Sequence, residues 1–418
     1  MAKFPFEPNL EAAMLRTMRV PLLDLSNEYQ VLAQPIREQL DEVFASQRFI
    51  LGPKVKEFEQ AIAEFCQAPF AIGVSSGTDA LLAVLMAYEI GSGDAVVTSP
   101  YTFFATAGCV VRLGARPVFV DVDPATCNIS VPALERFLRE QCKQTSSGLV
   151  LSDTGEKVRA IIPVHLFGQC CEMNKVYELA QEFRLRTIED AAQAIGAEYP
   201  FLDGTRKAGT MGEAGVFSFY PSKNLGAAGD AGLIICRDSY VADKLFAIRE
   251  HGMRPRYYHG LLGGNFRLDA IQAAILNVKL PYLNRWSAAR REAADFYRAQ
   301  FKTAGLTDTV CLPSEPYRDL VKEYHIYHQF VIRTPERDAL RAHLTKAEIG
   351  TEIYYPLALH QQKCFQNLGY REGHFPATER ATHESLALPI YPTISRDSQQ
   401  YVVSAIADFF SKRKRSAA

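Results

Sequence analysis

The sequence lacks the long apolar runs, charged leader and cysteine pairs that mark several classes of protein. No apolar run among its 418 residues reaches the ~20 residues that span a bilayer, and the N-terminus shows no charged-then-apolar signal pattern. The nine cysteines are an odd number without a C-x-x-C pair, so neither a disulfide framework nor a zinc site is indicated. We therefore expect a cytoplasmic protein with no membrane-spanning segment and no bound metal.

An excess of one charge is missing as well. Lys and Arg number 46 against 47 Asp and Glu, which gives a formal net charge of −1 and no reason to expect a nucleic-acid or membrane partner. We expect the basic run KRKR at 412–415 to be a solvated helix end. A chain of 418 residues is too long for one ordinary core, so two domains are expected.

From Ala71 onward, apolar runs of strand length alternate with helical segments. AIGVSS, AVVTS, RPVFVDV and RAIIPVHLFG each precede a helical pattern. Continuous Val and Ile runs between helices are typical of buried, mostly parallel strands and predict an α/β sandwich.

The alternation of predicted strands and helices changes after about residue 280. A long helical region is predicted from Leu268 to about Phe301, with a possible break at Pro281, followed by strands at 325–333 and 351–355. The expected parts are an N-terminal arm at 1–20, a large cofactor-binding domain at 21–285 and a small C-terminal domain at 286–418.

One lysine stands in an unusual setting, within the stretch FSFYPSKNLGAAGDAG from Phe217 to Gly232. Lys223 follows aromatic residues and precedes Gly and Ala, so we expect its amine to be desolvated. Desolvation favours the neutral, nucleophilic amine that condenses with aldehydes. Pyridoxal phosphate, carried as a Schiff base on a lysine, fits this setting. The alternative is a buried-edge lysine before a tight turn.

The stretch IEDAAQA at 188–194 is a second signal. Asp190 ends a short apolar strand among alanines, where an unpaired carboxylate is costly. It needs a cationic partner, and a protonated pyridine nitrogen would serve. Gln193 follows closely and is placed to donate to the phenolic oxygen of such a ring. The alternative for Asp190 is a helix N-cap.

Two further motifs follow predicted strands. SSGTD at 75–79 opens a helix, whose free amides bind phosphate, and Gly77 permits a close approach; a plain N-cap is the alternative. PYTFFAT at 100–106 puts aromatic residues at the exit of the next strand, where one ring can cover a planar cofactor or can simply be core.

Together these stretches resemble the DegT/DnrJ/EryC1/StrS family, the nucleotide-sugar aminotransferases of the type I pyridoxal-phosphate fold. The resemblance runs from about Val20 to Phe410 and rests on SSGTDAL, SPYTFFAT, IEDAAQAIGA, FSFYPSKNLGAAGDAG, NFRLDAIQAA and YYPLALHQQ, in the order of the family. It implies an aspartate aminotransferase-like α/β fold. The large domain would hold a mixed, mostly parallel sheet between helices, and a smaller C-terminal α+β domain would follow.

The resemblance also implies a role for each motif residue. Lys223 carries pyridoxal 5'-phosphate and moves the proton between cofactor and substrate, Asp190 pairs with the pyridine nitrogen, and Gln193 lies near the ring oxygen. Lys223 is the residue that dehydrating members replace by histidine, so transamination is expected.

Further contacts to the cofactor are implied in the same way. Phe103 would stack on the ring, and Gly77, Thr78 and Ser218 would hold the phosphate. Asn265 would reach the phosphate from the partner subunit, which implies an obligate homodimer with shared active sites.

The implied reaction moves an amino group from L-glutamate to a keto group of a nucleotide-linked sugar. The motifs look more like those of members that act at carbon 3 than at carbon 4, and carbon 4 stays an alternative. The candidate sugar contacts are Arg267, Tyr354, Tyr355 and His360. Because the two tyrosines would alternate faces on a strand, only one of them is expected to point into the site.

Two rival classes stay open. One is a cofactor-binding regulator that keeps the fold without catalysis, although no added DNA-binding segment is present. The other is a pyridoxal-phosphate enzyme of another type, such as a desulfurase or a lyase. A desulfurase needs a cysteine on a mobile loop, whereas Cys236 falls in a predicted strand.

Overall fold

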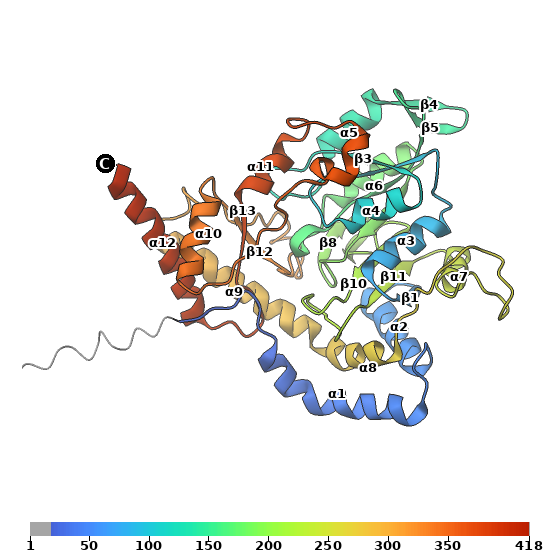
Figure 1. Ribbon diagram of the computed structural model, residues 1–418, viewed down its shortest axis with the longest axis horizontal. Coiled ribbons are helices and arrows are strands. Elements are labelled where there is room, and N and C mark those ends of the chain that lie inside the picture. The colour runs from blue at the N-terminus through green and yellow to red at the C-terminus, as the bar shows by residue number, and fades with distance from the viewer. Residues whose placement is uncertain (1–17, 418) are drawn as a thin grey trace, which may run out of the picture.

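Nine strands form the central sheet in a computed structural model that describes residues 18–417 (Figure 1). They are β1 (Phe70–Val74), β2 (Asp94–Thr98), β3 (Arg116–Phe119), β4 (Cys142–Thr145), β5 (Gly148–Leu151), β6 (Lys157–Ile162), β7 (Arg186–Asp190), β10 (Ala214–Ser218) and β11 (Gly232–Cys236). The main path has the order β1-β11-β10-β7-β6-β2-β3, with β5 beside β6 and β4 beside β5. From β10 to β3 all neighbours are parallel, and β11 is antiparallel to β1 and β10.

Helices cover both faces of this sheet (Figure 1). They are α1 (Ser26–Ser46), α2 (Pro53–Cys66), α3 (Gly77–Ala87), α4 (Ala105–Arg112), α5 (Val131–Glu140), α6 (Met173–Glu182), α7 (Ser239–Ile248) and α8 (Ala270–Lys279). Side chains of α3, α4 and α7 form one core with the sheet, and those of α2, α5, α6 and α8 form another. Val96 belongs to the first core and its neighbour Val97 to the second, because successive strand residues point to opposite faces. The predicted α/β sandwich with buried apolar strands is confirmed.

The C-terminal part is built on a long helix that leaves the sheet region (Figure 1). Its elements are η3 (Leu280–Tyr282), α9 (Leu283–Thr303), β12 (Phe330–Arg333), α10 (Arg337–Lys346), η4 (Leu359–Gln361), η5 (Lys363–Leu368), α11 (Pro376–Glu384), β13 (Ser385–Leu388) and α12 (Arg396–Ala417). The predicted break near Pro281 is confirmed, since a short 3-10 turn separates α8 from α9. Strands β12 and β13 pair antiparallel and pack with α9, α10 and α12 in a separate core.

The predicted strand at 351–355 is wrong. This segment makes one isolated bridge, between Glu352 and Ala387 of β13, and then leaves the sheet. Two hairpins were not predicted either, β4–β5 and β8 (Glu198–Phe201) with β9 (Gly204–Lys207). β4 and β9 are polar and largely exposed, so no apolar run marks them.

Helix α9 joins one core of the central sheet to the C-terminal core. Leu283, at its start, belongs to a core of the sheet, and Ala293 belongs to the C-terminal core. Val20 also joins the C-terminal core, through a bridge with Ile349. The domain limits at 20 and 285 stay predictions, and residues 1–17 of the expected arm lie outside the described residues.

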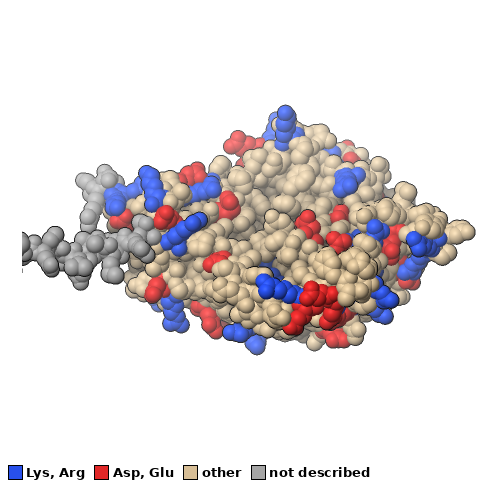
Figure 2. Space-filling model, turned by 60° about the horizontal axis from the view of Figure 1, so that its bottom comes forward, with Lys and Arg blue, Asp and Glu red and all other residues tan. Residues whose placement is uncertain are grey.

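The surface carries no large region of one charge on the face drawn in Figure 2, where basic and acidic side chains are interspersed. This mixture agrees with the net charge of −1. No helix within residues 18–417 combines the length and apolarity that a membrane-spanning segment requires.

Candidate active site

The predicted phosphate-binding residues meet where β10 ends and α3 begins. Gly77 is the first residue of α3, and a Cβ atom added there would lie 2.8 Å from the Cβ of Ser218, the last residue of β10. Real Cβ atoms do not approach so closely, so only glycine fits. The antiparallel pairing of Ser218 with Gly232 brings this end of β10 to the start of α3, since a Cβ on Gly232 would also collide with Ser76.

The first turn of α3 has one capped backbone amide and two amides without an acceptor among the described residues. The Ser76 hydroxyl accepts a hydrogen bond of 3.0 Å from the Asp79 amide, which is an N-cap. Within the described part of the chain, the amides of Gly77 and Thr78 have no acceptor. These two donors, at the positive end of the helix dipole, are available to an anion such as a phosphate group.

Lys223 lies in a tight turn after β10, where its own amide donates to the Tyr220 carbonyl at 2.8 Å. Its side-chain amine makes no hydrogen bond or ion pair to any described residue. Burial lowers the pKa of Lys223 to about 8, and the negative charge of Asp190 opposes that shift. A larger fraction of the amine is therefore neutral near neutral pH than for an ordinary lysine, as the sequence predicted.

The next residue anchors that turn to the C-terminal part. The side-chain nitrogen of Asn224 donates to the Ile326 carbonyl at 2.8 Å. The side-chain oxygen of Asn224 therefore accepts from Nδ1 of His328 at 3.2 Å. Burial holds the pKa of His328 well below its usual range, and the charge of Lys223 adds to this. The imidazole of His328 is therefore neutral, and its hydrogen bond to Asn224 holds the segment that carries Lys223 against the C-terminal part.

Asp190 lies at the end of β7 and is 5 % exposed. Its Oδ2 accepts a hydrogen bond of 2.8 Å from the Thr106 hydroxyl, and its Oδ1 accepts one of 3.2 Å from the Ala192 amide. Burial raises the pKa of Asp190, and these two hydrogen bonds act in the opposite direction. The helix N-cap alternative is wrong, because residues 191–197 form turns and no helix follows.

Gln193 and Phe103 border the same space. The oxygen of Gln193 accepts from the Phe167 amide at 2.7 Å, and its nitrogen donates to the Tyr355 hydroxyl at 2.9 Å. Phe103 is 58 % exposed, with its ring centre 6.4 Å from that of Tyr355. An exposed phenyl ring here is not core, so the core alternative for Phe103 is wrong, and its face is free to cover a flat ligand.

These groups fit pyridoxal phosphate. Two free amides at a helix start suit the phosphate, an uncommitted amine suits the aldehyde, and a buried carboxylate suits the pyridine nitrogen. Asp190 keeps a free lone pair on each oxygen for that nitrogen, since each oxygen accepts only one hydrogen bond from the protein.

Asn265 and Arg267 lie on a segment beside β1. The Phe266 carbonyl accepts from the Ser75 amide at 2.9 Å, and Arg267 forms an antiparallel bridge with Val74. The segment therefore runs along the end of β1 from which the phosphate-binding turn starts. Asn265 is exposed, and its assignment to the site of a partner subunit stays a prediction.

Arg267 borders an open hollow of about 690 Å3 with three other arginines, Arg249, Arg254 and Arg256. Its Nε is buried and has no hydrogen-bond partner among the described residues. Such a guanidinium suits a carboxylate or phosphate.

Of the remaining candidates, only Tyr355 joins the site. The backbone oxygen of Tyr354 accepts from the Tyr101 hydroxyl, and Tyr354 lines a small hollow together with His328 and Gln329. The expectation that only one tyrosine of the pair points inward stays a prediction, and the strand alternation on which it rested is wrong, because residues 351–355 form no strand.

The expectation for His360 needs correction. The residue lies in η4, is 3 % exposed, and its Nε2 is 3.1 Å from a carboxylate oxygen of Glu379. Its ring packs edge-on against Phe375, with centres 4.8 Å apart. His360 is thus enclosed by α11 and its aromatic neighbours and does not face an open site.

The sequence analysis missed a buried hydrogen-bond network around Glu189, the residue before Asp190 on β7. Glu189 is fully buried and accepts three backbone amides from residues 209–212, while Nε2 of His165 lies 2.8 Å away. Because Nδ1 of His165 accepts from the Cys171 amide, the imidazole hydrogen is on Nε2 and points at Glu189. The only available signal was a glutamate inside an apolar strand.

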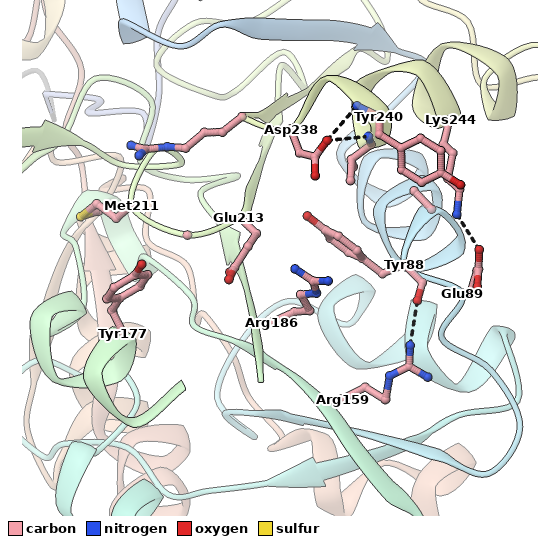
Figure 3. Close-up of a pocket in the computed structure, with 14 residues that line it drawn as sticks. Tyr88, Glu89, Arg159, Tyr177, Arg186, Met211, Glu213, Asp238, Tyr240 and Lys244 are labelled. Atoms are coloured by element: carbon pink, nitrogen blue, oxygen red, sulfur yellow. Dashed lines mark hydrogen bonds and ion pairs between the residues drawn. The ribbon is translucent and has the colours of Figure 1, made fainter. Parts of the chain in front are cut away.

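A separate hollow of about 370 Å3 is drawn in Figure 3. It is lined by the start of β7 at Arg186 and by Glu213 just before β10, which is the end of the sheet opposite Lys223. Most of its charged groups already have protein partners, such as Lys244 with Glu89 and Asp238 with the amides of α7 (Figure 3). It is not the candidate active site.

Comparison with known proteins decides the family. The family model described as the DegT/DnrJ/EryC1/StrS aminotransferase family matches residues 31–407. The chain belongs to this family. The fold class and the enzyme class expected from the resemblance, a pyridoxal-phosphate aminotransferase, are confirmed.

Three proteins to which the chain is similar bear different names. A protein of Geobacillus stearothermophilus named pleiotropic regulatory protein is 46 % identical over 393 residues, covering 94 % of this chain and 99 % of the relative. A UDP-N-acetyl-3-dehydro-alpha-D-glucosamine 3-aminotransferase of Acidithiobacillus ferrooxidans is 36 % identical over 393 residues, covering 94 % and 98 %. The crystal structure of NtdA from Bacillus subtilis, with bound cofactor PMP, is 27 % identical with a TM-score of 0.81, covering 94 % and 85 %.

Proposed function

We propose that this protein moves an amino group from L-glutamate to the keto group at carbon 3 of a nucleotide-linked sugar. The observation that carries the proposal is Lys223, an uncommitted amine with a pKa of about 8 that senses the charge of Asp190. Carbon 3 is supported by the Acidithiobacillus relative, whose name states a 3-aminotransferase. Transfer to carbon 4 is the alternative.

Pyridoxal phosphate, when bound, supplies an aldehyde that takes up the amino group and a ring that accepts electrons from the substrate carbon. The chain supplies the proton transfers and the geometry. Lys223, as a neutral amine, would take the proton from the donor carbon and pass it to the cofactor. In the second half of the reaction it would carry a proton from the cofactor to the sugar carbon. Asp190 would hold a proton on the ring nitrogen, and Phe103 would cover one face of the ring. The amides of Gly77 and Thr78, with Ser218 beside them, would hold the phosphate.

The sugar would enter past Tyr355, and the guanidinium of Arg267, whose buried Nε has no hydrogen-bond partner among the described residues, is a further candidate contact. We propose a homodimer in which Asn265 completes the phosphate site of the partner subunit, on the implication of the family resemblance. We place the reaction in the cytoplasm, which agrees with the nine free cysteines.

A non-catalytic regulator is a second candidate, favoured by the name of the Geobacillus relative. Such a protein needs cofactor binding but no proton transfer. The lowered pKa of Lys223 suits proton transfer and therefore favours the enzyme. Asp190 and the open amides of α3 suit cofactor binding in either case, so turnover separates the two candidates.

The decisive experiment compares the wild type, Lys223→Ala and the matched control Lys244→Ala. Lys244 is paired with Glu89 and lines the hollow at the opposite end of the sheet. Wild type and Lys244→Ala should carry covalently linked cofactor after borohydride reduction and transfer nitrogen from glutamate to 3-keto nucleotide sugars. Lys223→Ala should do neither.

A panel of 3-keto and 4-keto sugars on different nucleotides then tests the finer parts of the proposal. Turnover only with 4-keto sugars would refute carbon 3 while leaving the aminotransferase intact. Covalent cofactor without any turnover on the whole panel would favour the regulator.

A further inference from the structure

Asp190 is approached from α4 by Thr106, the last residue of the motif SPYTFFAT, to which the family resemblance assigned no role. Thr106, the second residue of α4, places its hydroxyl 2.8 Å from Oδ2 of Asp190. Thr102 lies in the segment before α4, with its hydroxyl oxygen 3.1 Å from that of Thr106. Thr102, Thr106 and Asp190 are 3 %, 0 % and 5 % exposed, so water cannot readily replace either hydrogen bond.

The direction of these hydrogen bonds follows from counting hydrogens. Each threonine hydroxyl has one hydrogen, and an ionised carboxylate only accepts. The hydrogen of Thr106 therefore points at Asp190, so the oxygen of Thr106 must accept from Thr102. Both hydroxyls are thus aligned toward the carboxylate, and each strengthens the next.

Few other groups near Asp190 can balance its charge. The titratable side chains that act on it are Lys223, His165, Cys109 and Tyr355. Of these, Lys223 is the one that can be a cation, because Nδ1 of His165 accepts from the Cys171 amide and its Nε2 hydrogen points at Glu189. Thr106 is the side chain that donates a hydrogen bond directly to the carboxylate.

We infer that Thr106 is a positioning residue, which together with Thr102 keeps Asp190 ionised and turned toward the cofactor nitrogen. The inference rests on the proposed function, because it concerns the carboxylate that would meet the pyridine ring. Phe103 lies just before Phe104, the N-cap of α4, so the same short segment carries the ring-covering side chain and the anchor of Asp190.

The test measures the dissociation constant of pyridoxal phosphate as a function of pH in three variants. Thr106→Val keeps the shape and removes the donor, and Thr106→Ser keeps the donor. Thr98→Val is the matched control, since the Thr98 hydroxyl is equally buried on β2 but donates to the Ile162 carbonyl at 2.8 Å.

Without its donor, Asp190 takes up a proton at higher pH and loses the ring nitrogen as a partner. Thr106→Val should raise the dissociation constant about tenfold to a hundredfold, the range for a hydrogen bond to a charged group. The loss should grow as the pH falls. Thr106→Ser should stay within a few-fold of wild type, and Thr98→Val should match wild type at every pH.

Wild-type affinity and pH dependence in folded Thr106→Val would overturn the inference. So would an equal loss in Thr98→Val, which would show a general packing effect. Melting temperatures of the two valine variants establish that both are folded. Failure of the wild type itself to bind pyridoxal phosphate would refute the proposed function instead.

Discussion

The side-chain amide of Gln193 and the hydroxyl of Tyr355 are joined by a hydrogen bond of 2.9 Å across 162 positions of the chain. The amide cannot be reversed without loss, because its oxygen already accepts from the Phe167 amide at 2.7 Å. The nitrogen of Gln193 therefore faces the active site, where a donor to the ring oxygen of the cofactor is expected. The hydrogen bond also ties the C-terminal part of the chain to the exit of β7.

Removal of that hydroxyl in Tyr355→Phe should weaken cofactor binding by up to about tenfold, since a neutral hydrogen bond contributes about 1 kcal/mol. The ring stays, so the fold should be kept. Titration of the cofactor-free protein with pyridoxal phosphate measures the effect. Tyr354→Phe is the control, because the Gln193 nitrogen donates to the hydroxyl of Tyr355 and not to that of Tyr354. Equal losses in both variants would contradict the role of Gln193.

The pH dependence of cofactor attachment should report the pKa of Lys223. Because burial lowers this pKa to about 8, the reactive neutral amine is the major form above that pH. The rate of covalent attachment should fall about tenfold per pH unit below it. Stopped-flow absorbance at several pH values measures this rate. A midpoint near 10.5, the ordinary value for lysine, would show that the amine is not desolvated.

Asp190→Asn should slow the half-reaction with glutamate by about two to three orders of magnitude, because the ring nitrogen loses its counter-ion. The fold should survive, since asparagine keeps the shape and can still accept from Thr106. The same change removes the charge that raises the pKa of Lys223, so the midpoint of cofactor attachment should move to lower pH. Normal single-turnover rates in this variant would leave Asp190 without a catalytic role.

Gly77→Ala should impair the phosphate site through a steric effect. The new methyl group would lie 2.8 Å from the Cβ of Ser218, and the shift needed to relieve this costs about 1–3 kcal/mol. We expect a lower melting temperature and weaker cofactor binding. Gly91→Ala is the control, because a Cβ there makes an ordinary contact of 3.5 Å. Unchanged cofactor affinity in Gly77→Ala would show that the phosphate binds elsewhere.

Subunit mixing tests whether one active site is built from two chains. If Asn265 serves the site of the partner subunit, Lys223→Ala and Asn265→Asp homodimers should be inactive or weak. Their heterodimer should regain about one competent site, because one site then has both intact residues. No recovery in verified heterodimers would place both residues in one site of a single chain.

The sequence by itself was sufficient for the fold class, and it predicted the residues at the centre of the candidate site. Continuous apolar runs predicted the buried strands, because a strand covered on both faces must be apolar throughout. The lysine in FSFYPSKNLGAAGDAG and the aspartate in IEDAAQA were recognisable since their neighbours could not solvate a charge. The break at Pro281 followed from the missing amide of proline.

Only the tertiary structure decided the roles of residues that depend on distant partners. His360 looked like a substrate contact, but α11 brings Glu379 and Phe375 to it and encloses the ring. Nothing in the sequence around Thr106 pointed to Asp190, and only the placement of β7 beside α4 brings that carboxylate to the Thr106 hydroxyl. Local sequence sets propensity and burial, whereas the partner of a polar group is fixed by which strands and helices pack side by side. A hydrogen bond forms only within about 3 Å, so the partner of a polar group can be assigned only when the packing of the strands and helices is known.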